Sequence, residues 1–165
     1  MKKTGTLTFF CGKMGAGKST ESKAISIEKN AVLISEDSWL SVHYPDQIKT
    51  FDDYLKFSSM IKPFIKSHVK NILKTGTDVV LDFPANTVNQ RRWFKQLCVD
   101  IECEHELVFI DLSNDKCLLQ IAKRRLEQPE RAQFDNEAMF NHVTKFFEAP
   151  LDSEELNIVH VLDDV

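Results

Sequence analysis

Two glycines, a lysine and a serine near the start of the chain have the spacing of a phosphate-binding loop. The stretch "GKMGAGKST" matches G-x-x-x-x-G-K-[ST] through Gly12, Gly17, Lys18 and Ser19. Backbone N–H groups can surround a phosphate chain only where no Cβ blocks close approach, so glycine is required there. We expect Lys18 to reach the β- and γ-phosphates of ATP and Ser19 to bind Mg²⁺. The predicted nucleotide-binding residues are Gly12, Lys13, Met14, Gly15, Ala16, Gly17, Lys18, Ser19 and Thr20.

Acidic residues accompany the apolar runs that lie downstream of this loop. Glu36 and Asp37 follow the second run, Asp82 lies in the third, and Asp111 lies in the fourth. Phosphoryl transfer needs a group that accepts the proton of the attacking hydroxyl and an oxygen ligand for Mg²⁺. We expect Asp37 to be the base, with Glu36 as the alternative, although both could be only helix-capping acids. As the second Mg²⁺ ligand we prefer Asp82 to Asp111, because the third strand usually adjoins the loop strand.

Arginines cluster in residues 124–135, "RRLEQPERAQFD", where Pro129 separates two helical patterns. Guanidinium groups match the geometry of phosphate oxygens. We therefore predict a mobile lid in which Arg124 acts in catalysis and Arg125 binds the nucleotide, with Arg131 as an alternative phosphate contact. The competing interpretation is an exposed helix end whose arginines pair with nearby glutamates.

These candidate residues require an arrangement of elements that brings them to one place. Short apolar runs alternate with longer amphipathic segments, which predicts a parallel sheet with helices on both faces and a ligand site beyond the carboxyl ends of the strands. Arg91 and Arg92, which follow the third run, are expected at the surface, with a contact to the acceptor as the alternative. The predicted strands are 7–11, 31–34, 79–83, 107–112 and 158–162, and the predicted helices are 18–29, 50–74, 87–98, 114–127 and 135–147.

Composition limits the class of protein. A chain of 165 residues, 42% hydrophobic, fits a single domain spanning residues 1–165. The net charge of −4 makes nucleic acid an unlikely partner. No apolar run reaches 18 residues and no signal peptide is predicted, so we expect a cytoplasmic protein with no membrane span. The four cysteines lack C-x-x-C spacing and are expected to be reduced.

The sequence resembles the small P-loop kinases known as AAA-type ATP-binding proteins, which are related to polynucleotide kinase, zeta toxin and chloramphenicol phosphotransferase. The segments that carry the resemblance are "GKMGAGKST", "SEDSW", "VVLDF" and "IAKRRLEQPE". It implies an α/β, three-layer P-loop NTPase fold, with a five-stranded parallel sheet in the order 2-3-1-4-5 and a small lid at about 124–135. It also implies that Asp37 deprotonates the acceptor hydroxyl, with Glu36 as the competing match.

Differences from related kinases reduce the range of acceptor molecules that we expect. Ser38, Trp39 and Leu40 stand where relatives often carry an arginine, and Ala85 replaces the arginine with which adenylate kinases grip a monophosphate. We therefore expect ATP-dependent transfer of the γ-phosphate to a hydroxyl of a small molecule. The alternatives are a regulatory ATPase without an acceptor and a toxin-like kinase of a nucleotide sugar. The oligomeric state is not predicted.

Overall fold

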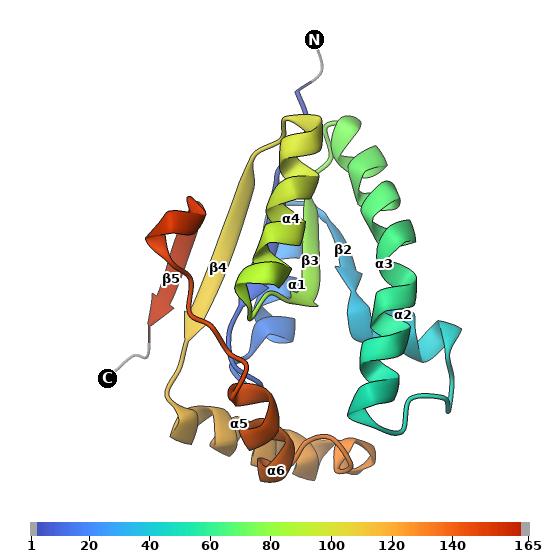
Figure 1. The fold of residues 1–165 in the computed structure, drawn as a ribbon, viewed down its shortest axis with the longest axis vertical. Helices are drawn as coiled ribbons and strands as arrows, with labels where there is room; N and C mark the ends of the chain where they lie inside the picture. Colours follow the sequence, from blue (N-terminus) through green and yellow to red (C-terminus); the bar gives the residue numbers. More distant parts are fainter. Residues whose placement is uncertain (1–2, 163–165) are drawn as a thin grey trace.

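The computed structural model describes residues 3–162 and places a five-stranded parallel sheet between two layers of helices (Figure 1). Neighbouring strands follow the order β2-β3-β1-β4-β5, and each pair is parallel. The predicted fold class and strand order are therefore confirmed. The strands are β1 (Leu7–Cys11), β2 (Val32–Ser35), β3 (Val79–Pro84), β4 (His105–Asp111) and β5 (Ile158–Leu162).

The helices correspond closely to the predicted segments, with one addition. The eight-residue helix α2 follows β2 directly and was not predicted, because two turns are too short to show a helical periodicity. The last helix begins two residues later than predicted because Asn136 caps its first turn by accepting a bond from the Met139 amide at 2.8 Å, and it ends at Thr144 instead of at 147. The helices are α1 (Lys18–Glu28), α2 (Glu36–His43), α3 (Phe51–Lys74), α4 (Val88–Ile101), α5 (Asn114–Glu127) and α6 (Glu137–Thr144), with 3₁₀ turns η1 (Pro129–Arg131) and η2 (Asp152–Glu154).

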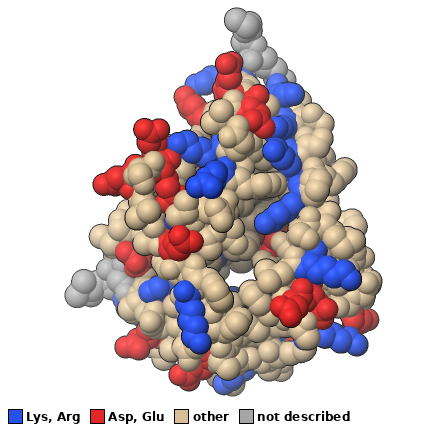
Figure 2. Space-filling model, in the orientation of Figure 1, with Lys and Arg blue, Asp and Glu red and all other residues tan. Residues whose placement is uncertain are grey.

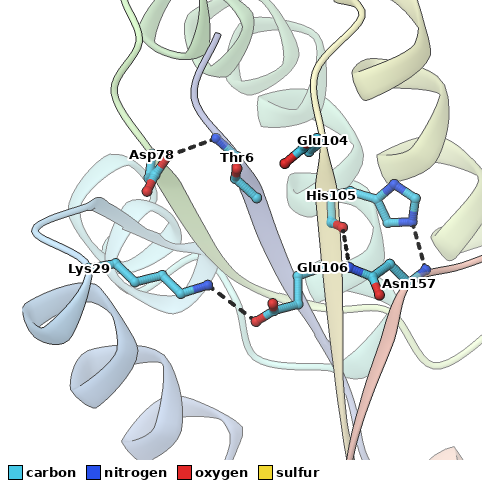
Figure 3. Close-up of a pocket in the computed structure, with 7 residues that line it drawn as sticks. All are labelled: Thr6, Lys29, Asp78, Glu104, His105, Glu106 and Asn157. Atoms are coloured by element: carbon cyan, nitrogen blue, oxygen red, sulfur yellow. Dashed lines mark hydrogen bonds and ion pairs between the residues drawn. The ribbon is translucent and has the colours of Figure 1, made fainter. Parts of the chain in front are cut away.

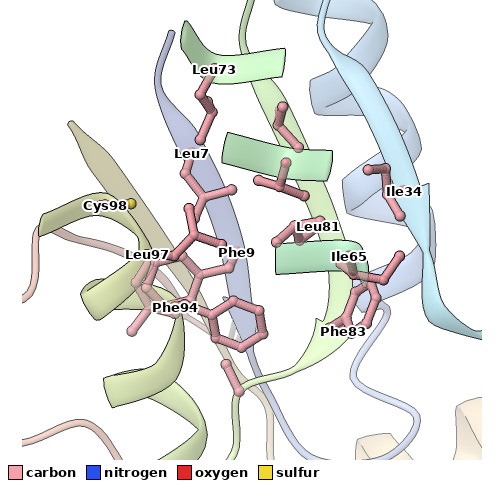
Figure 4. Packing of buried hydrophobic residues seen from close by; sticks show 14 of the residues in the cluster. Leu7, Phe9, Ile34, Ile65, Leu73, Leu81, Phe83, Phe94, Leu97 and Cys98 are labelled. Carbon is pink, nitrogen blue, oxygen red and sulfur yellow. The ribbon is translucent and has the colours of Figure 1, made fainter. Parts of the chain in front are cut away.

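The core forms two clusters, because successive side chains of each strand point to opposite faces of the sheet. On one face, shown in Figure 4, Phe9 and Leu81 pack against α3 and α4, and the Phe9 and Phe94 rings stack with centroids 4.9 Å apart. On the other face, Phe10 and Val80 pack with side chains from α5 and α6. Apolar packing on both faces fixes the sheet and hence the positions of its strand ends.

Parallel pairing brings the carboxyl ends of all five strands to one edge of the sheet, the lower edge in Figure 1. The loop 12–17, the start of α2, the turn after β3 and the start of α5 all leave the strands at this edge. Within residues 3–162, no helix is both long enough and apolar enough to cross a membrane.

Arg91 corrects one expectation about the surface. Its side chain is 0% exposed, whereas Arg92 is exposed as expected. The Arg91 guanidinium donates to Glu154 Oε1 at 2.8 Å and to the carbonyl oxygen of Ala85 at 3.0 Å. The negative charge of Glu154 compensates the positive charge of the buried guanidinium. The ion pair therefore connects α4 to the segment that follows α6.

Candidate active site

The loop between β1 and α1 has the backbone conformation that its glycines predict. Gly15 and Gly17 have φ angles of 80° and 100°, in the region that glycine adopts without strain. A Cβ on Gly15 would lie 2.6 Å from the carbonyl oxygen of Cys117, so α5 packs directly on the loop. Helix α1 begins at Lys18, and its positive dipole end therefore lies next to the loop.

Lys18 folds back over this loop. Its Nζ donates to the carbonyl oxygens of Gly12 and Lys13, the latter at 3.1 Å. Removal from water is the main cause that lowers the pKa of Lys18, and the positive charge of Arg124 lowers it further. Helix α5, which carries Arg124, also packs on the loop, since Cys117 and Ile121 lie against Gly15.

Three side chains predicted from different parts of the sequence meet beside Lys18. The Ser19 hydroxyl, in the first turn of α1, donates to the carboxylate of Asp82 on β3. Burial is the main cause that raises the pKa of Asp82, the negative charge of Asp37 raises it further, and Ser19 and Lys18 oppose the rise. The fold thus groups a hydroxyl, two carboxylates and an ammonium at the carboxyl edge of the sheet.

The two adjacent acids of α2 lie in different environments. Glu36 is 3% exposed and accepts hydrogen bonds from the hydroxyls of Tyr54 and Ser58, the latter at 2.7 Å. Burial raises its pKa, and these two hydrogen bonds oppose the rise. Asp37 is exposed to solvent at the start of α2 and acts electrostatically on Asp82. The Glu36 carboxylate is therefore engaged in packing α2 against α3.

The two candidates for the second acid also differ. Asp82 contacts Ser19, whereas the Asp111 carboxylate lies 3.1 Å from Nε2 of His160 on β5. Asp111 is the last residue of β4, and its partner there is Leu162 of β5. In the strand order, β1 separates β4 from β3, the strand that carries Asp82.

The arginines of residues 124–135 are organised by one buried acid. Asp135 is 1% exposed; its Oδ2 and Oδ1 accept from Nε and Nη2 of Arg124 at 2.7 and 2.6 Å. The same Oδ2 accepts from Nε of Arg131 at 2.9 Å. Arg125 is exposed on α5. The sequence analysis assigned no role to Asp135, although it is the only acid in the segment after Arg131.

Asn86 is a second residue that the sequence analysis missed. Its Oδ1 accepts a hydrogen bond from the Gly12 amide at 2.9 Å, and its carbonyl oxygen accepts from the Glu148 amide at 2.8 Å. It therefore connects the phosphate-binding loop to the turn after β3 and to the segment after α6. No local motif could have shown this, since Asn86 and Gly12 are 74 positions apart.

Among the described residues, one cavity lies at the amino edge of the sheet and a smaller one lies at its carboxyl edge. The larger, of about 550 Å³, is at the amino edge, where Lys29 pairs with Glu106 and His105 pairs with Asn157 (Figure 3). The smaller, of about 80 Å³, lies beside the residues described above, between α2, α3, β3 and α4. Its lining includes Glu36, Tyr54, Ser58, Ser59, Lys62, Phe83, Gln90 and Phe94.

The donors near Lys18 suit Mg²⁺. This ion prefers oxygen ligands and is usually bound by one or two protein groups together with phosphates and water. The Ser19 hydroxyl and the Asp82 carboxylate are such donors and already contact each other. The described part of the chain contains no group of three or more His, Cys, Asp or Glu side chains that could hold a metal ion by themselves.

A family model described as an AAA domain matches residues 7–150. No curated protein matches the sequence.

Many solved structures share the fold. A candidate kinase from Chloroflexus aurantiacus is 17% identical with a TM-score of 0.74, over 98% of this chain and 87% of that chain. Kti12 from Chaetomium thermophilum, in complex with ADP-AlF3, is 16% identical with a TM-score of 0.68, over 96% and 89%. The APS kinase CysC from Mycobacterium tuberculosis, in complex with AMPPNP and APS, is 18% identical with a TM-score of 0.60, over 99% and 91%.

Proposed function

The chain belongs to the AAA domain family, and from that premise we propose that it is an ATP-dependent phosphotransferase that moves the γ-phosphate to a hydroxyl of a small molecule. The resemblance to small P-loop kinases expected from the sequence is confirmed. The observation that carries the proposal is that Ser35 pairs with Asp82 across β2 and β3, so that Asp37, two residues further on in α2, stands at the same end of these strands as Asp82. A carboxylate placed there can accept a proton from an alcohol, which an ATPase without an acceptor does not require.

The nucleotide would bind at the loop 12–17 and the start of α1. Backbone amides of the loop hold the phosphates, and Lys18 exchanges its bonds with the loop carbonyls for bonds with phosphate oxygens. ATP as the donor is supported by the AMPPNP and ADP-AlF3 bound to the similar proteins named above. Ser19 and Asp82 would hold Mg²⁺, which when bound neutralises charge on the phosphates.

Arg124 would neutralise the charge that develops on the transferred phosphoryl group. Its guanidinium is held by Asp135 and lies close enough to Lys18 to lower the pKa of that lysine. Stabilisation by a cation that is already in position requires little rearrangement during the reaction. Arg125, which is exposed on the same helix, would contact the nucleotide from the outer side.

Asp37 would be the general base. It is exposed to solvent, whereas the neighbouring Glu36 is engaged by the hydroxyls of Tyr54 and Ser58. The small cavity lined by Glu36 lies at the carboxyl edge of the sheet and is where the acceptor would bind.

The test is the variant Asp37→Asn, assayed on alcohols that accept labelled phosphate from ATP in a screen of metabolites and antibiotics. We expect Mg²⁺·ATP affinity within a few-fold of wild type and transfer slower by about 10²–10⁴, the usual effect of removing a general base.

Asp46→Asn is the matched control. Asp46 is exposed after α2 with a φ of 60°, a conformation that asparagine tolerates equally well. Full transfer by Asp37→Asn would refute the assigned role. ATP hydrolysis with no transfer to any alcohol would favour the regulatory ATPase.

A further inference from the structure

We infer that the acceptor is an anionic alcohol, a compact molecule that carries a phosphate or carboxylate group besides the hydroxyl that reacts. The inference rests on the proposed function and concerns the small cavity between α2, α3, β3 and α4. Its lining comes from the first residue of α2, the end of β3 and the first halves of α3 and α4. The cavity therefore lies at the carboxyl edge of the sheet, the edge at which the phosphate-binding loop also leaves β1.

Lys62 supplies positive charge to this cavity. It stands on α3, and its Nζ lies 5.9 Å from the centre of the Trp93 ring on α4, so it spans the space between the two helices. Its charge lowers the pKa of Glu36, against the larger effect of burial. The Lys62 ammonium is therefore close enough to act on a ligand in the cavity.

Basic residues continue from Lys62 along the outer groove between α3 and α4. Lys66 and Lys70 follow at four-residue spacing and so share one face of α3. Both lie near a single acid, Asp100, which can neutralise only one of them. Figure 2 shows lysine and arginine side chains gathered over these two helices, above a hollow in the lower half of the view. This groove is positive although the whole chain carries a net charge of −4.

The other cavity groups need no charged ligand. Glu36 already accepts two hydrogen bonds from protein hydroxyls, so it does not require a cationic acceptor. Ser59 and Gln90 can donate hydrogen bonds to an anion, and the Phe83 and Phe94 rings provide an apolar wall. Lys62 is the basic residue of this lining, and its ammonium is the group with which an anionic part of the acceptor would pair.

The spacing of the lysines limits the size of the acceptor. A helix rises about 1.5 Å per residue, so Lys66 lies about 6 Å and Lys70 about 12 Å beyond Lys62 along α3. A compact molecule whose hydroxyl reaches Asp37 can place its anionic group at Lys62 and not at Lys70. Lys70 is therefore too far along the groove to contact such an acceptor.

The experiment compares alcohols in matched pairs as acceptors of labelled phosphate from ATP. The phosphorylated members are glycerol 3-phosphate, ribose 5-phosphate and glucose 6-phosphate, the carboxylated members are glycerate and gluconate, and the neutral partners are glycerol, ribose and glucose. We expect transfer to members of the anionic half only. The phosphate and carboxylate arms identify which anion is recognised.

The variant Lys62→Gln should raise the KM for the accepted alcohol by about 10-fold or more, the effect of losing a hydrogen bond to a charged group. The kcat should change less than about three-fold, because Lys62 binds the part of the molecule that does not react. Lys74→Gln is the control, since Lys74 is exposed at the far end of the same helix.

Transfer to a neutral alcohol as efficient as to its anionic partner would overturn the inference and leave the proposed function standing. An unchanged KM in Lys62→Gln would also overturn it. If no alcohol in either half accepts phosphate while ATP is bound and hydrolysed, the proposed function fails and the inference fails with it.

Discussion

The substitution Asp135→Asn should loosen the segment that carries the arginines. The Asp135 carboxylate accepts two hydrogen bonds from Arg124 and one from Arg131. Asparagine keeps one oxygen and places an NH₂ group against a guanidinium, so at least one charged hydrogen bond is lost, at about 1.5–3 kcal/mol. Because the arginine side chains are 31% and 38% exposed, water can replace part of the loss. We expect about 2 kcal/mol, less than the 3–5 kcal/mol typical of a broken buried pair.

The assay is hydrogen exchange at the Asp135 amide, which donates to the carbonyl oxygen of Arg131 at 2.7 Å. A loss of about 2 kcal/mol in local stability corresponds to exchange about 30-fold faster. Glu130→Gln, an exposed charge in the same segment, should leave the rate unchanged. Exchange within about three-fold of wild type in Asp135→Asn would refute the view that this carboxylate holds the segment in place. Addition of Mg²⁺·ATP should slow exchange here if the segment is a lid.

Three further substitutions test single contacts. Lys18→Ala should abolish phosphoryl transfer and greatly weaken ATP binding, measured by calorimetry, and an unchanged affinity would exclude a phosphate-binding role. The free energy of unfolding of Glu36→Gln should rise relative to that of wild type as the pH rises above 4.5. Burial raises the pKa of Glu36, so ionisation of this carboxyl destabilises the folded wild type. Parallel pH profiles of the two proteins in urea unfolding would argue against this. Gly15→Ala should lower the free energy of unfolding in urea by about 1–3 kcal/mol, because the new Cβ would meet the carbonyl oxygen of Cys117. A urea midpoint equal to that of wild type would show that α5 can move away from the loop.

The features that the sequence predicts well are those whose cause is local. Each strand is a short apolar run between polar segments, and β1 and β5 begin and end at the predicted residues. The loop motif lies within nine consecutive positions, and the φ angles of Gly15 and Gly17 follow from the same steric argument that identified it. The helix α5 likewise has its predicted bounds, with Ser113 accepting a bond from the Lys116 amide as its cap.

The features that the sequence did not predict depend on residues far apart in the chain. Arg91 is one residue from an exposed arginine, and only its partner Glu154, 63 positions away, explains why one is buried and the other is not. The choice between Asp82 and Asp111 also depends on distant residues, because both follow similar apolar runs, but the expected strand order allowed a preference. Strand β3 pairs with β1 as expected, whereas Asp111 pairs with Leu162 of β5.

These long-range contacts hold two parts of the proposed site through different residues. The nucleotide half is fixed by the Asn86 bond to Gly12 and by the close packing of α5 on Gly15. The acceptor half, α2 and α3, touches the arginine segment through a bond from Gln133 to the carbonyl oxygen of Lys49 at 2.7 Å. Under the proposed function, changes in α2 and α3 alter which alcohol binds without disturbing the loop that holds the phosphates. A substitution such as Lys62→Gln should accordingly change acceptor affinity while ATP affinity stays constant, which separates the two halves experimentally.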